Sequence, residues 1–136
     1  MKRIAILLDG ALPTGAASNV AAILMGQAAI RVPEIYAEQP VPDMDGNLHA
    51  AIRYSTVILK AGRGQMQNVL LQIRKEHPEI TYSAFTTTGQ GLHNAFEKYE
   101  TYLHEHHTAD LEIVGLILVG EESEVRLITK KFSVFK

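Results

Sequence analysis

The sequence predicts a three-layer α/β domain, and three observations carry that prediction. Ile4 to Leu8 is a short continuous apolar run, as in a strand that is covered on both faces. After Asp9-Gly10 and the connection Leu12-Pro13-Thr14-Gly15, in which Thr14 is a candidate N-cap, small and apolar residues follow helical spacing from Ala16 to Ile30. The order of strand and helix then recurs along the chain, which is typical of parallel strands joined by right-handed crossovers.

The remaining elements are predicted by the same patterns. Residues 34–54 are rich in proline, and Asp45-Gly46-Asn47 predicts the tip of a small hairpin. Residues 122–131 begin with acids and end with bases as a helix does, although their apolar residues also alternate as in a strand; we predict a helix. The predicted strands are Thr56–Leu59, Ile80–Phe85, Ile113–Val119 and a short edge strand at Phe132–Phe135, and the other predicted helices are Met66–Ile73 and a segment from about Leu92 to Leu103.

Length and composition restrict the class of protein. The 136 residues, 46% of them hydrophobic, fit one globular domain that spans residues 1–136. A net charge of −2 does not support binding to nucleic acid, and no apolar stretch is long enough to cross a membrane. The sequence contains no cysteine, which excludes disulfides and thiolate metal sites and fits a reducing compartment. We therefore expect a cytoplasmic protein.

Polar residues follow the expected ends of three strands. Asp9, Lys60 and the run Thr86-Thr87-Thr88 lie at these ends, and glycine-rich helix starts come next. Ligands of parallel sheets bind at the carboxyl ends of the strands, and free backbone N–H groups at helix starts bind anions. Ordinary crossovers also need glycines and caps, and no phosphate-binding fingerprint is complete. The residues expected to bind a phosphate or carboxylate are Thr14, Lys60, Arg63, Thr86, Thr87 and Thr88.

Three histidines near the end of the helix predicted from about Leu92 to Leu103 resemble metal ligands. His104, His106 and His107 are close in sequence, but no carboxylate or further histidine is fixed beside them by spacing. A solvated helix end is the favoured interpretation. We expect neither a metal ion nor a cofactor.

Two segments, LLDGALPTGAASNVAAILMG and IVGLILVGEESEVRLITKKFSVF, resemble the uncharacterised family known as domain of unknown function two thousand. That family in turn is similar to the archaeal and eukaryotic class of peptidyl-tRNA hydrolase, whose strand ending in Lys-Ala is matched by Lys60-Ala61. The resemblance implies a three-layer α/β/α sandwich with a mostly parallel four-stranded mixed sheet, in which the last main strand is antiparallel. It also implies a homodimer.

The chain departs from the hydrolases at two motifs. Their helix-start lysine falls on or beside Asn19, and the aspartate of their Asp-Ala-Gly-x-Thr loop is replaced by threonine in the segment Thr87 to Gly91. The resemblance therefore implies the fold more directly than the peptidyl-tRNA activity.

Three functions remain open from the sequence, and whether the protein is an enzyme is open with them. The first is a domain that binds a small anionic ligand at the strand ends. The second is a hydrolase of an ester or amide such as peptidyl-tRNA, with Asp9 as base or orienting group and Asn19 holding an oxyanion. The third is a dimeric assembly protein. The Asn19 amide either reads a ligand or ties down the crossover near Leu12 and Pro13.

Overall fold

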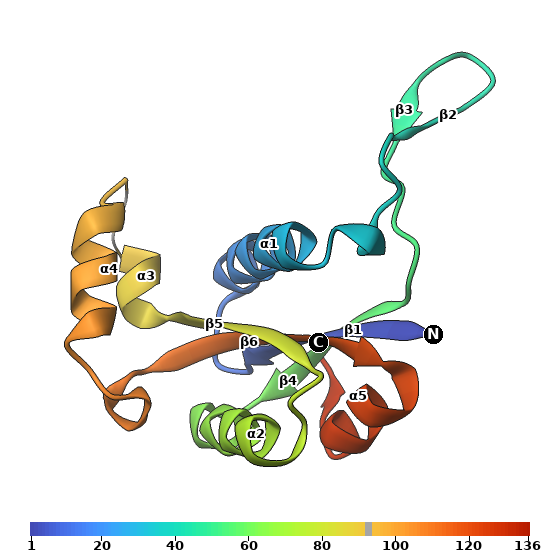
Figure 1. Cartoon of the computed structure of the whole chain (residues 1–136). Helices are drawn as coiled ribbons and strands as arrows, with labels where there is room; N and C mark the ends of the chain where they lie inside the picture. Colours follow the sequence, from blue (N-terminus) through green and yellow to red (C-terminus); the bar gives the residue numbers. More distant parts are fainter. Residues whose placement is uncertain (92–93) are drawn as a thin grey trace.

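The computed structural model of the chain describes residues 1–91 and 94–136, and these form an α/β protein with one mixed main sheet (Figure 1). The strands of this sheet are β1 (Lys2–Asp9), β4 (Thr56–Ala61), β5 (Thr81–Thr86), β6 (Ile113–Glu121) and β7 (Ser133–Val134), in the order β5-β6-β1-β4-β7. The sheet thus has five strands, and the expected number of four is wrong. The predicted edge segment near the carboxyl end pairs with β4 and becomes the fifth strand.

The strand directions correct a second expectation. β1 and β4 are parallel neighbours, but β6 runs antiparallel to both β1 and β5. Helices α3 (Thr87–Gly91) and α4 (Phe96–His104) lie beyond the end of β5 instead of crossing a face of the sheet (Figure 1). The chain therefore enters β6 at the same end of the sheet at which β5 finishes, which makes the two strands antiparallel. The antiparallel last main strand implied by the family resemblance is confirmed.

Helices cover the two faces of the sheet unequally. Helix α1 (Thr14–Arg31) lies over β1, β5 and β6 on one face, while α2 (Arg63–Glu76) and α5 (Glu122–Thr129) cover the other (Figure 1). The helix predicted for residues 122–131 is confirmed, with an end two residues earlier. Thr14 is the first residue of α1 and not its N-cap, because Pro13 holds that position. The start expected near Leu92 lies outside the described residues, and α4 begins at Phe96.

Alternation along β1 divides the core into two clusters. Ile4, Ile6 and Leu8 point toward α1, whereas Ala5 and Leu7 point toward α2 and α5. All five side chains are at most 2% exposed, as expected for a strand that is covered on both faces. By the same alternation, residues at odd positions of β1 face the α2 and α5 side.

A hairpin projects from the body of the protein between α1 and β4 (Figure 1). We call residues 37–51 the arm; it contains β2 (Val41–Pro42) and β3 (Leu48–His49). The Asp43 carboxylate accepts hydrogen bonds from the backbone N–H groups of Asp45 and Asn47, and Gly46 adopts a φ of +85° at the tip. The predicted hairpin turn is confirmed. Below the arm lies a short 3₁₀ turn, Pro33–Ile35, and a second such turn, Thr108–Asp110, precedes β6.

No helix among the described residues is long and apolar enough to cross a membrane.

Candidate functional site

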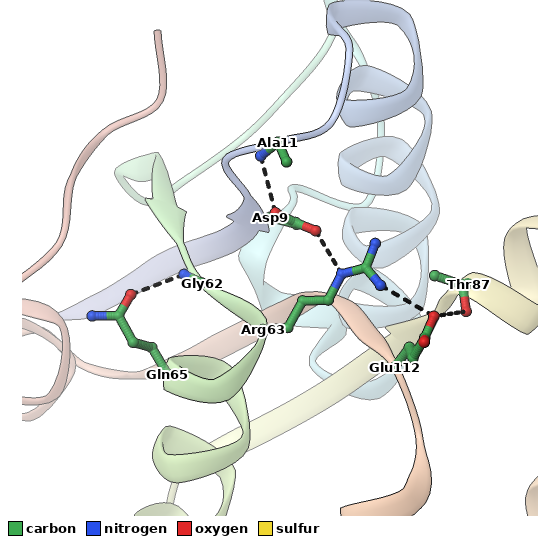
Figure 2. A network of polar contacts seen from close by, with 7 residues as sticks. All are labelled: Asp9, Ala11, Gly62, Arg63, Gln65, Thr87 and Glu112. Carbon is green, nitrogen blue, oxygen red and sulfur yellow. Dashed lines mark hydrogen bonds and ion pairs between the residues drawn. The ribbon is translucent and has the colours of Figure 1, made fainter.

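Asp9 ends β1 and is held there by two donors. The Ala11 N–H donates to its Oδ1 atom at 2.9 Å, and the Arg63 Nε–H donates to its Oδ2 atom at 2.7 Å (Figure 2). Asp9 is only 7% exposed, so the carboxylate is a buried charge that these two partners must satisfy. Because Arg63 is the first residue of α2, the ion pair joins the end of β1 to the start of that helix.

Glu112 completes a chain of polar contacts along the same edge of the sheet. Its Oε2 atom accepts from Arg63 Nη1 at 3.1 Å and from Thr87 Oγ1 at 3.2 Å (Figure 2). The Thr87 N–H also donates to the Glu112 carbonyl oxygen, which fixes the two residues side by side. The Glu112 side chain is 66% exposed, in contrast to Asp9. Two donors of different elements therefore converge on one exposed carboxylate oxygen.

The charges of this network favour ionised side chains. Burial opposes ionisation of Asp9, but the Ala11 N–H and the Arg63 guanidinium outweigh it and hold the pKa of Asp9 below its usual value. The hydrogen bond to Asp9 raises the pKa of Arg63 further, and the charge of Glu112 adds to the effect. Asp9 is thus a carboxylate with little affinity for a proton, and both of its oxygens already accept hydrogen bonds.

At the starts of α2 and α3, a nearby side chain accepts a hydrogen bond from a backbone N–H group. At α2, the Gly62 N–H donates to the Gln65 side-chain oxygen at 2.9 Å (Figure 2). At α3, the Gly89 N–H donates to Thr86 Oγ1 at 3.2 Å. Thr86 is 3% exposed, so its hydroxyl serves the turn and does not face solvent. Thr88 lies half-buried within α3.

Two expected site residues lie on the other side of the sheet. Lys60 alternates with Leu59 and Ala61, which pack on the α2 side, so its side chain points to the α1 side and away from Arg63. There it runs beside Gly10, where an added Cβ would come within 2.7 Å of Lys60 Cγ. Thr14 borders a small apolar hollow on that same α1 side. Lys60 and Thr14 therefore do not join the network around Arg63.

Asn19 is exposed on α1. The hydrogen bonds of the described residues include none from its amide to Leu12 or Pro13. The core-facing positions of the helix are Ala17, Val20 and Ala21. The tie to the crossover considered from the sequence is therefore not formed.

Glu112 is the site residue that sequence reasoning missed. It directly precedes the most apolar strand, β6, and the strand-to-helix order alone suggests a parallel β6 that starts at the opposite edge. The antiparallel direction brings the start of β6, and Glu112 with it, to the carboxyl ends of β1, β4 and β5. The position of Glu112 before β6 therefore indicates a site residue only when the direction of β6 is known.

The part of the chain that the structure describes contains no group of three or more His, Asp or Glu side chains arranged to hold a metal ion. In the histidine-rich segment, His106 Nδ1 lies 2.7 Å from the Tyr102 carbonyl oxygen, and the His106 ring stacks on Tyr102 with centroids 4.0 Å apart.

A mixed sheet between helices, with a network of charged and polar side chains at the carboxyl ends of three strands, defines an α/β protein. Its sequence matches the family described as "Protein of unknown function (DUF2000)" over residues 2–136, and the chain belongs to that family. A solved structure of a protein of unknown function from Agrobacterium tumefaciens strain C58 is similar, with a TM-score of 0.85 at 20% identity over 99% of this chain and 98% of that one. This likeness shows the fold alone. No curated protein matches.

Proposed function

We propose that the strand-end edge binds a small carboxylate ligand, and that the ligand takes the place of the Glu112 side chain. The observation that carries this proposal is the convergence of Arg63 Nη1 and Thr87 Oγ1 on one oxygen of an exposed carboxylate. Glu112 then acts as an internal stand-in for the ligand, because its carboxylate occupies the position that the carboxylate of the ligand would take. An exposed ion pair contributes only about 0.2–1 kcal/mol, so an incoming carboxylate can displace it.

The charge balance favours a carboxylate over a phosphate. Asp9 already neutralises Arg63, so the edge is electrically neutral once Glu112 has moved away. A dianionic phosphate would add two negative charges beside the Asp9 carboxylate. A monoanion that accepts from Arg63 and Thr87 reproduces the contacts of Glu112 without further repulsion.

The geometry supports binding more than catalysis. A general base works best with a pKa near the operating pH, whereas the pKa of Asp9 lies below its usual value and both oxygens are engaged. The expected oxyanion donor, Asn19, is exposed on α1 and shares no described hydrogen bond with Asp9. A kinship in fold with the peptidyl-tRNA hydrolases and a cytoplasmic location remain part of the proposal, since the similar solved structure is itself of unknown function.

Titration of the protein with acetate, followed by NMR of the backbone amides, tests the proposal. We expect shifts at Arg63 and Thr87. Arg63→Gln should abolish them, and Glu112→Ala should tighten binding by about two- to fivefold, the equivalent of an exposed ion pair. Glu100→Ala on α4 is the matched control, because it removes one exposed carboxylate away from the network. Weaker binding in Glu112→Ala than in the control would contradict the stand-in role.

The arm favours a second candidate function, assembly with a second copy of the chain. Val41 is 52%, Leu48 68% and Met44 fully exposed, and a two-stranded hairpin is marginally stable without further packing. On the α1 side of the sheet, an apolar hollow of about 100 Å³ is lined by residues that include Ile58 and Phe135. We propose that the arm of one copy places an apolar side chain in this hollow of another.

Charge complementarity supports the second copy as the occupant. The arm carries Glu38, Asp43 and Asp45 and contains no lysine or arginine. Beside the hollow, Lys60 points to the same face of the sheet as Ile58, and Lys136 follows Phe135 at the chain end. The acidic arm would thus meet a basic rim.

Sedimentation equilibrium tests the assembly. We expect a dimer for the wild-type chain and a monomer for Met44→Asp. Leu71→Asp, which changes a 54% exposed residue on α2, should remain dimeric. A wild-type chain that stays monomeric at high micromolar concentration would rule out the assembly, and so would dimers of equal stability in all three proteins.

A further inference from the structure

A basic hollow lies on the α5 side of the sheet, away from the strand-end network. Its volume is about 220 Å³, and three cations from separate parts of the chain line it. Arg3 belongs to β1 and Arg126 to α5, and Lys130 is the residue that directly follows α5. Leu59 and Phe132 form its apolar wall. Arg3 and Asp9 are six residues apart on β1, which places the two regions about 20 Å from each other.

Arg3 is the unusual member of this group. Its Nε–H is buried, and among the described residues no oxygen accepts a hydrogen bond from it. A guanidinium is charged at any physiological pH, and a buried donor without a partner costs free energy, so such groups are rare and call for an acceptor. Arg126 and Lys130 alone would be explained by the C-terminal end of α5, which favours cations. Arg3 belongs to a strand and has no such explanation.

The neighbouring acids are engaged elsewhere. Glu121 pairs with the amino group of Met1 at 3.0 Å, and Glu124 lies 2.8 Å from His77 Nδ1. Among the described residues, Glu122 is the one acid that pairs with a cation of the hollow, at 3.6 Å from Arg126 Nε, and both side chains of that pair are largely exposed. Three positive charges against one weakly held negative charge leave the hollow with a net charge of about +2, which matches a phosphate monoester of about −2.

We propose that this hollow binds the phosphate group of a small phosphorylated molecule. The two guanidinium groups suit phosphate oxygens, to which arginine donates in a fork, and Lys130 adds a flexible point charge. Leu59 and Phe132 offer an apolar contact to the organic part of the ligand. The site rests on residues other than those of the carboxylate-binding edge, so either proposal can fail while the other stands.

Isothermal titration with phenyl phosphate and with inorganic phosphate, at constant ionic strength, tests the proposal. We expect both probes to bind the wild-type chain. Arg126→Gln and Lys130→Gln should each weaken binding by about tenfold, the effect of one lost charge-assisted hydrogen bond. Lys131→Gln is the matched control, since it removes the same charge from the adjacent exposed residue, which does not line the hollow. Tighter binding of phenyl phosphate than of inorganic phosphate would assign the site to a monoester, and equal binding would assign it to the free ion.

Arg3→Met provides a second test that does not depend on the exposed cations. The substitution removes the guanidinium whose buried Nε–H has no acceptor among the described residues, so we expect the melting temperature without ligand to stay the same or rise, and the increase caused by phenyl phosphate to disappear. Three results would overturn the proposal. These are no binding of either probe beyond that of chloride, an equal loss in Lys131→Gln and Arg126→Gln, and loss of phosphate binding in Arg63→Gln.

Discussion

Val20 on α1 lies directly against Gly115 on β6, so that a Cβ added at Gly115 would come within 2.6 Å of Val20 Cγ1 and 2.8 Å of Leu24 Cδ1. The missing side chain thus sets how closely the helix approaches the sheet. We expect Gly115→Ala to lower the free energy of unfolding by about 1–3 kcal/mol through overpacking. Gly26→Ala on the same helix is the control: its Cβ would meet nothing within 4 Å, and loss of a helical glycine should stabilise by up to about 1 kcal/mol. Urea unfolding measures both, and equal effects would contradict the close approach.

Asp9→Asn should change how stability depends on pH. The pKa of Asp9 is lowered in the folded chain, so the carboxylate stabilises the fold above its unfolded pKa of 3.8 and loses this effect as the pH falls through the lower folded value. At neutral pH we expect the variant to lose about 1 kcal/mol, a modest value because Arg63 is 43% exposed. The difference from wild type should shrink below about pH 4. Asp45→Asn on the arm is the control, and a difference that persists in acid would contradict the assignment.

Asn19→Ala should stabilise the protein. Asn19 is exposed within α1, and alanine is the better helix former by up to about 0.7 kcal/mol. Asn68→Ala, at an exposed position of α2, should give a similar gain. Thermal unfolding of the two variants checks the expectation. A loss of 1 kcal/mol or more in Asn19→Ala alone would contradict this expectation. Because a broken buried hydrogen bond costs about 1–3 kcal/mol, such a loss would indicate that the Asn19 amide has a structural role.

Tyr99→Phe should protect the protein against alkaline unfolding. Burial raises the pKa of Tyr99, and a hydrogen bond with Thr86 only partly offsets this effect. A raised pKa means that stability is present below the unfolded pKa of 10.0 and is lost as the pH rises above it. The variant keeps the edge contact with the Phe85 ring, so we expect its stability near pH 8 to stay within about 1.5 kcal/mol of that of wild type. Its stability should then fall less steeply than that of wild type above about pH 10, and parallel curves would contradict the prediction.

Most elements could be predicted because their signals are local. The runs at Ile4–Leu8 and Ile113–Val119, the spacing of Met66 to Ile73 and the turn at Gly46 each reflect burial or backbone conformation within a few residues. Strand direction is not local in this sense. It depends on whether a helix crosses the sheet, and α3 and α4 lie beyond the end of β5 instead.

The residues of the candidate site show the same division between what local sequence signals predict and what depends on strand direction. Asp9, Arg63 and Thr87 were expected at the strand ends and do meet, through Glu112, whose position depends on the direction of β6. Lys60 also ends a strand, so the sequence predicts it in the same group, yet the alternation of side chains places it on the other face of the sheet. A position at the end of a strand therefore predicts at which end of the sheet a residue lies. It does not predict to which face of the sheet the side chain points.

The bridge between Tyr36 and Ile52 at the base of the arm makes the two ends of that excursion neighbours. The Ala37 N–H donates to the Ala51 carbonyl oxygen, so the chain leaves and re-enters the body at nearly one point. A short Asn-Gly turn could therefore join Tyr36 to Ile52 without moving β4 or α1. The length of the arm has little effect on the stability of the rest of the protein, because doubling the length of a loop costs only about 0.6 kcal/mol. The fold thus carries a segment that can be exchanged or lengthened while the sheet and both of its polar regions stay as they are.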